Sequence, residues 1–296
     1  MARPKRVAVL VNPGSNRGGD ERDRVLAAFE RHGIVSVPVA CPRAADALGA
    51  ALRAAAPHAD AFAVGGGDGT LHAALPALLA IARPLGVLPL GTANDFAASL
   101  GLPADVDAAV AVIAAGRSAR VDLGAVNGRP YLNAASIGLG AEVTRHLTRE
   151  RKQRLGALGY PLTALERWRA SRPFAAKLRW DGGERVLRTR QISIANGPRQ
   201  GGRVANPAGG LATGRLALAC LTARSPWRAL VAMLALRLGL GEQADGVVAL
   251  EAPRFEVTTR RSLEISADGE IVGRTPAVFE AWPGALEVFV AEEAGA

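Results

Sequence analysis

The stretch AFAVGGGDGTLHAAL, Ala61 to Leu75, decides the fold of the first half of the chain. An apolar run leads into a loop with one carboxylate, Asp68, and four glycines, and residues with helical spacing follow. Backbone N–H groups of a glycine-rich loop can approach phosphate oxygens, and the start of the next helix adds partial positive charge. The stretch therefore predicts a strand, an anion-binding loop and a helix, with a carboxylate that needs explaining.

The residues on either side repeat this alternation of strand and helix. Apolar runs typical of buried parallel strands occupy residues 6–12, 34–40, 59–65, 84–91 and 119–126. Helical spacing occupies residues 21–32, 44–56, 70–82 and 105–115, and a short helix precedes Gly101. Alternating strands and helices joined by short loops predict an α/β domain with a doubly wound sheet.

The pattern changes after Val126. Strand-like runs occupy residues 129–144, 175–196, 215–223, 254–273 and 286–293, and hairpin turns are expected at 181–183 and 268–269. Helices are expected at about 158–170 and 227–238. We therefore predict an α/β domain over residues 1–126 and a mainly antiparallel β domain over residues 127–296, whose last strand could return to the first domain.

Composition limits the class of protein. Hydrophobic residues make up 49% of the 296 residues, which suffices for a large core, and only 4% are aromatic, which argues against a nucleic-acid stacking surface. Cys41 and Cys220 have no metal-binding spacing and indicate a reducing compartment. The longest apolar run, at 229–241, is interrupted by Arg237. We expect a cytoplasmic protein that does not bind nucleic acid.

The net charge of +9 is concentrated in one segment. Residues 142–190 contain thirteen Lys and Arg against five Asp and Glu, a net charge of +8. One interpretation is an ordinary solvated basic face. The other is a patch that meets an anionic phospholipid surface, together with the apolar helix expected within 225–241.

Three loops are expected along one edge of the first sheet. They are NPGSNRGG at 12–19, GGGDGT at 65–70 and PLGTANDF at 89–96. The carboxyl ends of parallel strands form the ligand crevice of such a sheet, so the loops predict a nucleotide-phosphate site. The chain has only three lysines, Lys5, Lys152 and Lys177, so the phosphate charge must be met by backbone N–H groups, Arg17 and Mg²⁺.

The two carboxylates in these loops each have two interpretations. Asp68 either shares a Mg²⁺ ion with the phosphates or stabilises a turn through its own side chain. Asp95 either contributes to the same metal site or caps the short helix before Gly101.

The loop motifs resemble the catalytic domain of diacylglycerol kinases, in particular the bacterial soluble lipid kinases that are related to sphingosine kinases. VDLG at Val121, YLNAASIGLGAEV at Tyr131, NGPRQGG at Asn196 and ADGE at Ala267 follow in that family's order. The resemblance implies an ATP- and Mg²⁺-dependent lipid kinase. It also implies an α/β nucleotide domain joined to a β-sandwich, with the active site in the cleft between them.

The resemblance assigns roles to individual residues. Glu270 is the implied general base, with Asp68 second, and Asp68, Asp95 and Asp122 are the implied acidic residues of the Mg²⁺ site. The expected nucleotide-binding residues are Asn12, Pro13, Gly14, Ser15, Asn16, Arg17, Cys41, Gly65, Gly66, Gly67, Asp68, Gly69, Thr70, Leu71, Gly91, Thr92 and Asn94.

Two departures from the family pattern matter. Cys41 stands where relatives often have threonine, and a thiol is a weak hydrogen-bond donor. Residues 207–218 lack the acidic residues that hold a structural Mg²⁺ in some relatives, so we expect no second metal site near Thr213.

Several readings stay open at this point. A kinase of a soluble alcohol such as NAD or a sugar, and an inactive nucleotide-binding regulatory module, are the alternatives to a lipid kinase. Diacylglycerol, phosphatidylglycerol, a sphingoid base and a glycolipid all present a primary hydroxyl. Peripheral association with the membrane is expected, and the oligomeric state, a homodimer included, stays open.

Overall fold

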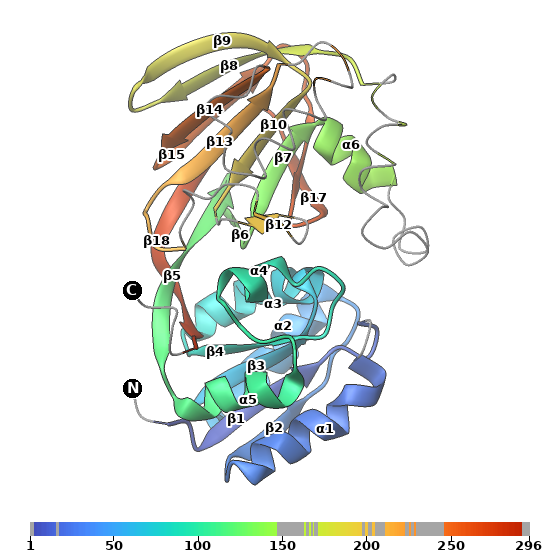
Figure 1. Ribbon diagram of the computed structural model, residues 1–296, viewed down its shortest axis with the longest axis vertical. Coiled ribbons are helices and arrows are strands. Elements are labelled where there is room, and N and C mark those ends of the chain that lie inside the picture. The colour runs from blue at the N-terminus through green and yellow to red at the C-terminus, as the bar shows by residue number, and fades with distance from the viewer. Residues whose placement is uncertain are drawn as a thin grey trace. The chain divides into compact units, whose positions relative to one another are not determined.

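The structure is a computed structural model that describes residues 3–15, 18–146, 163, 166, 168, 171–196, 199–200, 203–204, 211–222, 225, 228 and 246–291. The chain forms two compact units (Figure 1). The first runs to Asp122 and resumes at Gly284, and the second spans Leu123–Pro283. Within the described residues, no helix combines the length and apolarity needed to cross a bilayer.

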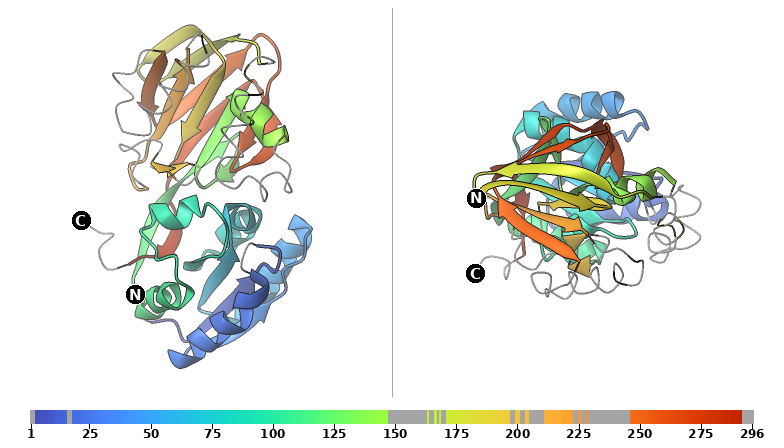
Figure 2. Two further views of the ribbon diagram at one scale, coloured as in Figure 1. Left: turned by 45° about the vertical axis from the view of Figure 1, so that its right-hand side comes forward. Right: turned by 90° about the horizontal axis from the view of Figure 1, so that it is seen from above.

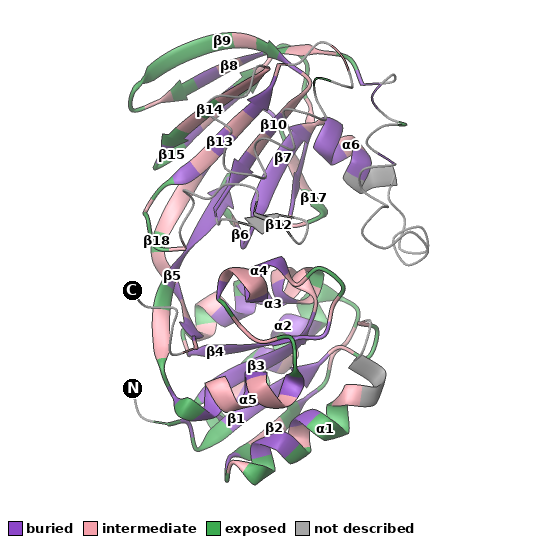
Figure 3. Ribbon diagram, viewed as in Figure 1, coloured by how far each residue is buried: buried purple, intermediate pink, exposed green. Residues whose placement is uncertain are grey.

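The sheet of the first unit is parallel. Its strands are β1 (Arg6–Val11), β2 (Val35–Val39), β3 (Ala61–Gly66) and β4 (Leu85–Pro89), in the order β2-β1-β3-β4. The end of β18 (Ala277–Phe289) continues this order, because Val288 pairs with Leu85 in parallel. β1, β3 and β4 are buried along almost their whole length (Figure 3), as strands covered on both faces must be.

Helices cover both faces of this sheet (Figures 1 and 2). α1 (Gly18–Arg31) packs against α5 (Val106–Ala115), and α2 (Ala45–Ala55) packs against α3 (Asp68–Ile81). The 3-10 turn η1 (Ala56–His58) and the short α4 (Asp95–Ser99) complete the unit. Val7, Val9 and Val11 share a core with α1 and α5, as the two-residue period of a strand requires. The predicted doubly wound domain is confirmed.

The second unit contains two sheets. One has the order β14-β13-β10-β7-β16-β17 and is antiparallel throughout. Its strands are β7 (Ala134–Gly138), β10 (Gln191–Ala195), β13 (Leu216–Leu221), β14 (Val247–Ala252), β16 (Glu264–Ala267) and β17 (Glu270–Arg274). The other has the order β18-β15-β8-β9, with β5 (Ser118–Val126) paired to β18 and β6 (Arg129–Tyr131) paired to β5. Its remaining strands are β8 (Phe174–Trp180), β9 (Gly183–Thr189) and β15 (Arg254–Thr259).

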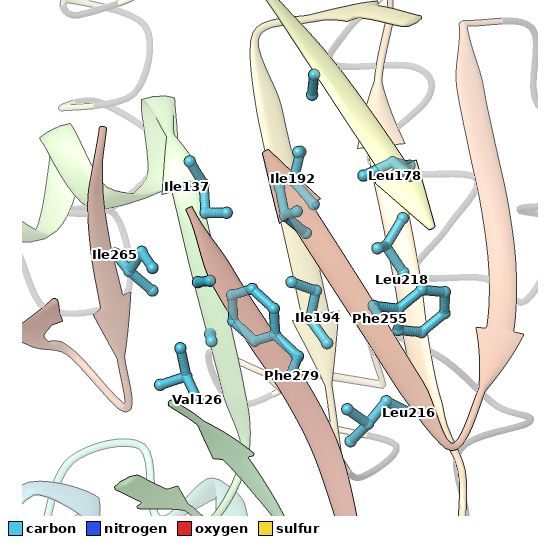
Figure 4. Close-up of a cluster of buried hydrophobic side chains, with 14 of the residues drawn as sticks. Val126, Ile137, Leu178, Ile192, Ile194, Leu216, Leu218, Phe255, Ile265 and Phe279 are labelled. Atoms are coloured by element: carbon cyan, nitrogen blue, oxygen red, sulfur yellow. The ribbon is translucent and has the colours of Figure 1, made fainter. Parts of the chain in front are cut away.

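Apolar side chains of both sheets form one core (Figure 4). Phe255 and Phe279 come from one sheet, and Ile192, Ile194 and Leu218 come from the other. All five are almost completely buried. The second unit is therefore a β-sandwich. A small separate ribbon is formed by β11 (Arg199–Gln200) and β12 (Arg203–Val204).

Two strands carry the chain from one unit to the other. β5 crosses the boundary at Asp122 and Leu123, and β18 crosses back at Pro283 and Gly284. The first part of β18 pairs with β15, and its end pairs with β4. The hairpin turns expected at 181–183 and 268–269 are both present.

The prediction of a strand-like run at residues 129–144 is wrong in its last part, after β6 and β7. The run at 129–144 ends in a helix, α6 (Leu139–His146), because Gly138 takes a positive φ of 88° and ends β7. Leu139 and Val143, four residues apart, pack with Leu221 on the outer face of the sheet. The helices expected at 158–170 and 227–238 lie outside the described residues, apart from Thr163, Glu166, Trp168 and Arg228, which are helical.

Candidate functional site

Three loops meet at one edge of the parallel sheet. β1, β3 and β4 are neighbours that run in the same direction, so their carboxyl ends lie side by side. The loops that leave them are Asn12–Ser15, the turn at Gly67, and Leu90–Asn94. This edge is where ligands bind in open parallel sheets.

The first loop is bonded to the second through Asn12. Its backbone N–H donates to the carbonyl oxygen of Gly65 at 2.8 Å, and its side-chain Nδ2 donates to Oγ1 of Thr70 at 2.8 Å. Its Oδ1 accepts the backbone N–H of Gly14 at 2.9 Å, which closes a tight turn. Asn12 therefore fixes the first loop to the start of α3.

The second and third loops touch through their backbones. A Cβ atom added to Gly91 would lie 2.4 Å from the Cα of Gly67, and one added to Gly67 would lie 3.2 Å from the Cα of Gly91. Real Cβ atoms do not come as close as the first distance, so the contact requires glycine at position 91. The pair explains why both loops are rich in glycine.

The carboxylate of Asp68 also connects these two loops. Its Oδ2 accepts the backbone N–H of Asp95 at 3.0 Å, and its Oδ1 accepts that of Phe96 at 3.0 Å. Both N–H groups belong to the first turn of α4, where a helix has no partners of its own for them. Asp68, the first residue of α3, thus caps the start of a different helix.

Asn94 completes the third loop. It takes a positive φ of 52°, which asparagine tolerates better than most residues. Its Oδ1 accepts the backbone N–H of Gly91 at 2.9 Å, and its Nδ2 donates to the carbonyl oxygen of Gly91 at 2.9 Å. The loop that presents Thr92 is therefore closed on itself, and Thr92 is exposed.

The start of α3 is open on one side. Gly69 is exposed, and a Cβ atom added there would meet no atom within 4 Å. The first turn of a helix directs backbone N–H groups outward and carries partial positive charge. A phosphate group could approach the backbone here as it does at other helix starts.

The second unit contributes Glu270, the first residue of β17. Its side chain is exposed. The turn that precedes it, Asp268–Gly269, is bonded to the segment Leu132–Ala134, and Asn196 is bonded to the same segment. Three motifs that are far apart in the sequence therefore come together beside Glu270.

Known proteins share this organisation. Residues 6–126 match the diacylglycerol kinase catalytic domain, and residues 133–290 match the YegS C-terminal NAD kinase beta sandwich-like domain. A Pseudomonas aeruginosa protein named "Probable lipid kinase YegS-like" is 33% identical over 291 residues, which are 95% of this chain and 93% of that protein. This chain belongs to the diacylglycerol kinase family.

Two further relatives agree with this assignment. A Bacillus subtilis protein named "Diacylglycerol kinase" is 32% identical over 287 residues, with 93% of each chain covered. The crystal structure of a diacylglycerol kinase from Bacillus anthracis has a TM-score of 0.76 at 19% identity and covers 99% of this chain and 100% of that chain. That likeness shows the shared fold, and the family that the loop motifs indicate is confirmed.

The residues that the family motifs assign to the nucleotide have different surroundings. Gly65 and Gly66 are buried at the end of β3, and a Cβ atom on Gly66 would lie 2.5 Å from Oγ1 of Thr70. Leu71 is a core residue of α3. Pro13, Gly14, Gly69 and Thr92 are exposed, and Ser15 is partly so. Asn16 and Arg17 lie outside the described residues.

Cys41 follows β2 and is half-buried. Burial raises the pKa of its thiol, so the group stays protonated at neutral pH and can donate only weakly. Near the first sheet's edge it is therefore a poor substitute for a threonine hydroxyl. Thr213 lies where we expect no second metal site, and its Oγ1 donates to the carbonyl oxygen of Arg215 at 3.3 Å.

The three acidic residues of the expected metal site are bound in different ways. Asp95 is 7% exposed, and Asp122 is 3% exposed with its Oδ1 accepting the backbone N–H of Gly284 at 2.8 Å. Among the residues that the structure describes, no three His, Cys, Asp or Glu side chains gather as a metal site would require. A Mg²⁺ ion bound with a nucleotide needs only one or two carboxylates, because the phosphates supply the other ligands.

Sequence reasoning missed Asp268, Asn133 and Asn196. Asp268 accepts backbone N–H groups, and Asn133 and Asn196 are buried to 6% and 1% exposure. Each lies in a motif that the family order already marked, YLNAAS, NGPRQGG or ADGE. The available signal was that each asparagine directly follows an apolar residue in its motif, since a polar side chain that becomes buried must find partners.

The capping role of Asp68 predicts the effect of Asp68→Asn on stability. An asparagine side chain has one acceptor oxygen, so one of the two backbone N–H groups loses its partner and faces an NH₂ group instead. We expect unfolding to become easier by about 1–3 kcal/mol. Urea unfolding without nucleotide and without Mg²⁺ measures this effect apart from any metal role.

Asp23→Asn is the matched control, because Asp23 is exposed on α1. Its unfolding free energy should change by no more than about 0.5 kcal/mol. Equal stability of Asp68→Asn and Asp23→Asn in the absence of ligands would contradict the capping role.

Proposed function

We propose that this protein transfers the γ-phosphoryl group of ATP to the hydroxyl group of a lipid. Membership of the diacylglycerol kinase family supports phosphoryl transfer from ATP. The observation that carries the proposal in the structure is the joined set of three loops at the edge of the parallel sheet, with the start of α3 open at Gly69. Such an edge suits a triphosphate.

The nucleotide is held mainly by backbone N–H groups in this proposal. The first loop, Asn12–Arg17, the loop before α3 and the loop at Thr92 surround the phosphates, and Cys41 contributes weakly on the adenosine side. Lysine is absent from all three loops, so no lysine ammonium group from these loops contributes to phosphate binding. The transfer has a largely dissociative transition state, for which the positions of donors matter more than the strength of any one base.

Asp68, Asp95 and Asp122 are the residues that we propose to hold Mg²⁺. Their carboxylates are hard oxygen donors, as Mg²⁺ requires. One or two of these carboxylates would suffice for an ion bound together with the nucleotide, which when bound neutralises charge on the phosphate oxygens.

Glu270 is the proposed general base. A lipid hydroxyl must lose its proton as the phosphoryl group arrives, and a carboxylate is the usual acceptor. Glu270 is exposed at the first position of β17, where a strand rather than a loop holds its backbone. Asp68 is the second candidate for this role.

The lipid is expected to be reached at the membrane surface. The described part of the basic segment 142–190 includes the hairpin of β8 and β9, an exposed edge of the sandwich with Arg185 and Arg188 (Figure 3). Neither arginine forms an ion pair with another described residue, whereas Lys177 pairs with Glu184 at 2.9 Å. An anionic phospholipid surface would attract these cations.

Gly69→Ala separates phosphate binding from folding. A Cβ atom at Gly69 meets open space, and alanine favours a helix over glycine, so stability should be unchanged or higher. The same methyl group lies where a phosphate oxygen must approach the backbone. We expect the dissociation constant for Mg·ATP, measured by calorimetry, to rise about tenfold, which is ~1.4 kcal/mol.

Gly91→Ala is the counterpart, because its Cβ atom would collide with the backbone of Gly67. We expect it to lower both the melting temperature and the affinity. Unchanged ATP affinity in Gly69→Ala would exclude a phosphate at the start of α3.

Glu270→Gln tests the reaction and the base together. The purified protein is incubated with γ-labelled ATP, Mg²⁺ and micelles of diacylglycerol, phosphatidylglycerol, a sphingoid base or a glycolipid. We expect one lipid to be labelled, and kcat to fall about 10²–10⁴-fold in the variant with ATP binding unchanged. Glu251→Gln is the matched control, since Glu251 is also an exposed glutamate on a strand of the β-sandwich.

Full activity in Glu270→Gln would assign the base elsewhere. Label in NAD or a sugar instead of a lipid would replace the proposed acceptor by a soluble alcohol. ATP binding without transfer to any acceptor would indicate a regulatory module.

Vesicle binding tests the membrane surface. We expect the protein to sediment with phosphatidylglycerol vesicles and to be released as ionic strength rises from about 0.05 M to about 0.5 M, because salt screens exposed charges. The double variant Arg185→Gln, Arg188→Gln should bind up to roughly 30-fold more weakly, at about 1 kcal/mol for each arginine. An affinity for vesicles that changes neither with ionic strength nor with the double substitution would contradict the electrostatic explanation.

A further inference from the structure

The turn that precedes Glu270 has two consecutive residues with positive φ. Asp268 has a φ of 48° and Gly269 a φ of 90°, the pattern of a two-residue hairpin turn with both central residues left-handed. Ala267 and Glu270 are paired across this turn, so Glu270 is the first residue that leaves it. The position of the Glu270 backbone is therefore set by the geometry at Asp268.

Asp268 is fixed by its side chain. Its Oδ2 accepts the backbone N–H of Leu132 at 2.7 Å, and its Oδ1 accepts those of Asn133 at 2.9 Å and Ala134 at 3.3 Å. Its own N–H donates to the carbonyl oxygen of Ala134 at 3.0 Å. Three consecutive backbone N–H groups around one carboxylate form the kind of nest that binds an anion.

The segment that forms this nest is held from its other side by Asn196. The Nδ2 of Asn196 donates to the carbonyl oxygen of Leu132 at 2.9 Å, and the backbone N–H of Asn196 donates to the carbonyl oxygen of Asn133 at 2.8 Å. Asn196 is 1% exposed, and hydrogen bonds shielded from water are electrostatically stronger. The nest therefore has a rigid base.

Asp268 also influences the core of the sandwich. Burial, with a smaller contribution from the negative charge of Asp268, raises the pKa of Tyr131 well above its usual value. Tyr131 is completely buried beside the nest, at the residue before Leu132. Asp268, which is only partly buried, thus lies at the border of the packed core.

A second contact holds the far side of the hairpin. The pairing of β16 and β17 shifts between Ile265 and Ser266, which leaves Val272 without a cross-strand partner in the register. The Nη1 of Arg129 donates to the carbonyl oxygen of Val272 at 3.0 Å. β17, an edge strand, is thereby tied to β6 two residues beyond Glu270.

We propose that Asp268 is a positioning residue for phosphoryl transfer, which holds the hairpin so that the carboxylate of Glu270 stays where it can accept a proton. This inference rests on the proposed role of Glu270 as base. Asp268 itself does not touch the substrate in this proposal, since its oxygens bind the amides of residues 132–134. Asn196 holds the segment that Asp268 binds, and Arg129 holds the hairpin directly at Val272.

Asp268→Asn removes one acceptor oxygen and adds an NH₂ group that faces backbone N–H donors, so the hairpin must shift. A displacement of about 1 Å at the reacting groups can lower a rate by about 10²-fold. We expect kcat to fall by about this factor while KM for ATP is unchanged, because the nucleotide loops belong to the other unit. The rate is measured with the lipid acceptor identified by labelling.

The decisive comparison repeats the substitution in the Glu270→Gln background. If Asp268 acts through Glu270, adding Asp268→Asn there causes no further loss of kcat, since the two residues form one unit. Losses that multiply in the double variant would mean that Asp268 acts on its own. An unchanged kcat in Asp268→Asn alone would equally overturn the proposal.

Hydrogen exchange provides a readout that does not require activity. The amides of Leu132, Asn133 and Ala134 should exchange faster in Asp268→Asn than in the unaltered protein, and at the normal rate in Glu270→Gln. Unchanged exchange in Asp268→Asn overturns the anchoring. This result holds even if no lipid is phosphorylated, so a failure of the proposed function is distinguishable from a failure of the positioning role.

Gly269→Ala disturbs the turn while keeping Asp268, in case Asp268→Asn folds poorly. A Cβ atom there meets open space, so the only strain is that of an alanine at a φ of 90°. Gly273→Ala is the matched control on the same strand, with open space and no positive φ. We expect kcat to fall in Gly269→Ala and to stay unchanged in Gly273→Ala, and equal behaviour of the two would contradict the proposal.

Discussion

The contact between the backbones of Gly67 and Gly91 is the constraint on which the first unit depends. A Cβ atom at either position would push the loops after β3 and β4 apart, and at Gly91 it would lie 2.4 Å from the opposite Cα. With the loops apart, Asp68 could not reach the N–H groups of Asp95 and Phe96. The start of α3 and the start of α4 therefore lie close together because both loops lack side chains where they meet.

Short carboxylates that bind backbone N–H groups recur throughout the molecule. Oδ2 of Asp60 accepts the N–H groups of Lys5 and Arg6 at 3.0 and 2.9 Å, and Asp122 accepts that of Gly284 at 2.8 Å. Asp68 and Asp268 bind backbone N–H groups in the same way, at the two places that we propose to be functional. An aspartate side chain is short enough to hold a backbone without the entropy loss of a long side chain. Such bonds fix loops more firmly than exposed ion pairs do.

The secondary structure of the first half of the chain could be predicted from its residues more fully than that of the second half. Buried parallel strands are continuous apolar runs, so the doubly wound sheet and the three loops at its edge could be derived from the residues alone. The same reasoning failed at α6, because residues 129–144 have the apolar content of a strand, whereas Gly138 ends β7 and Gly140 packs close to the Ser136 side chain at the start of a helix. Local spacing did not reveal that packing.

The bonds of the candidate site were beyond sequence reasoning for a clear physical reason. Asp68 and its partner Asp95 are 27 residues apart, and Asp268 and Leu132 are 136 residues apart. Hydrogen-bond partners at such separations are set by the tertiary fold. A turn residue with its own local bond and a turn residue bound to a distant loop have the same sequence signal. The ADGE motif pointed to Glu270, and the neighbouring Asp268 became visible only through its partners.

Rigidity in both units follows from the chemistry of phosphoryl transfer. The transition state forms few new covalent bonds to protein groups, so the protein contributes mainly by holding donors and acceptors in place. Asp68 connects the loops after β3 and β4 through two consecutive backbone N–H groups, and Asp268 holds the hairpin of the proposed base through three. In both places a carboxylate follows or precedes a glycine, which supplies the space or the backbone angle that the bond needs. The glycines and aspartates of GGGDGT and ADGE thus act as pairs, and exchanging either member removes the geometry that the other maintains.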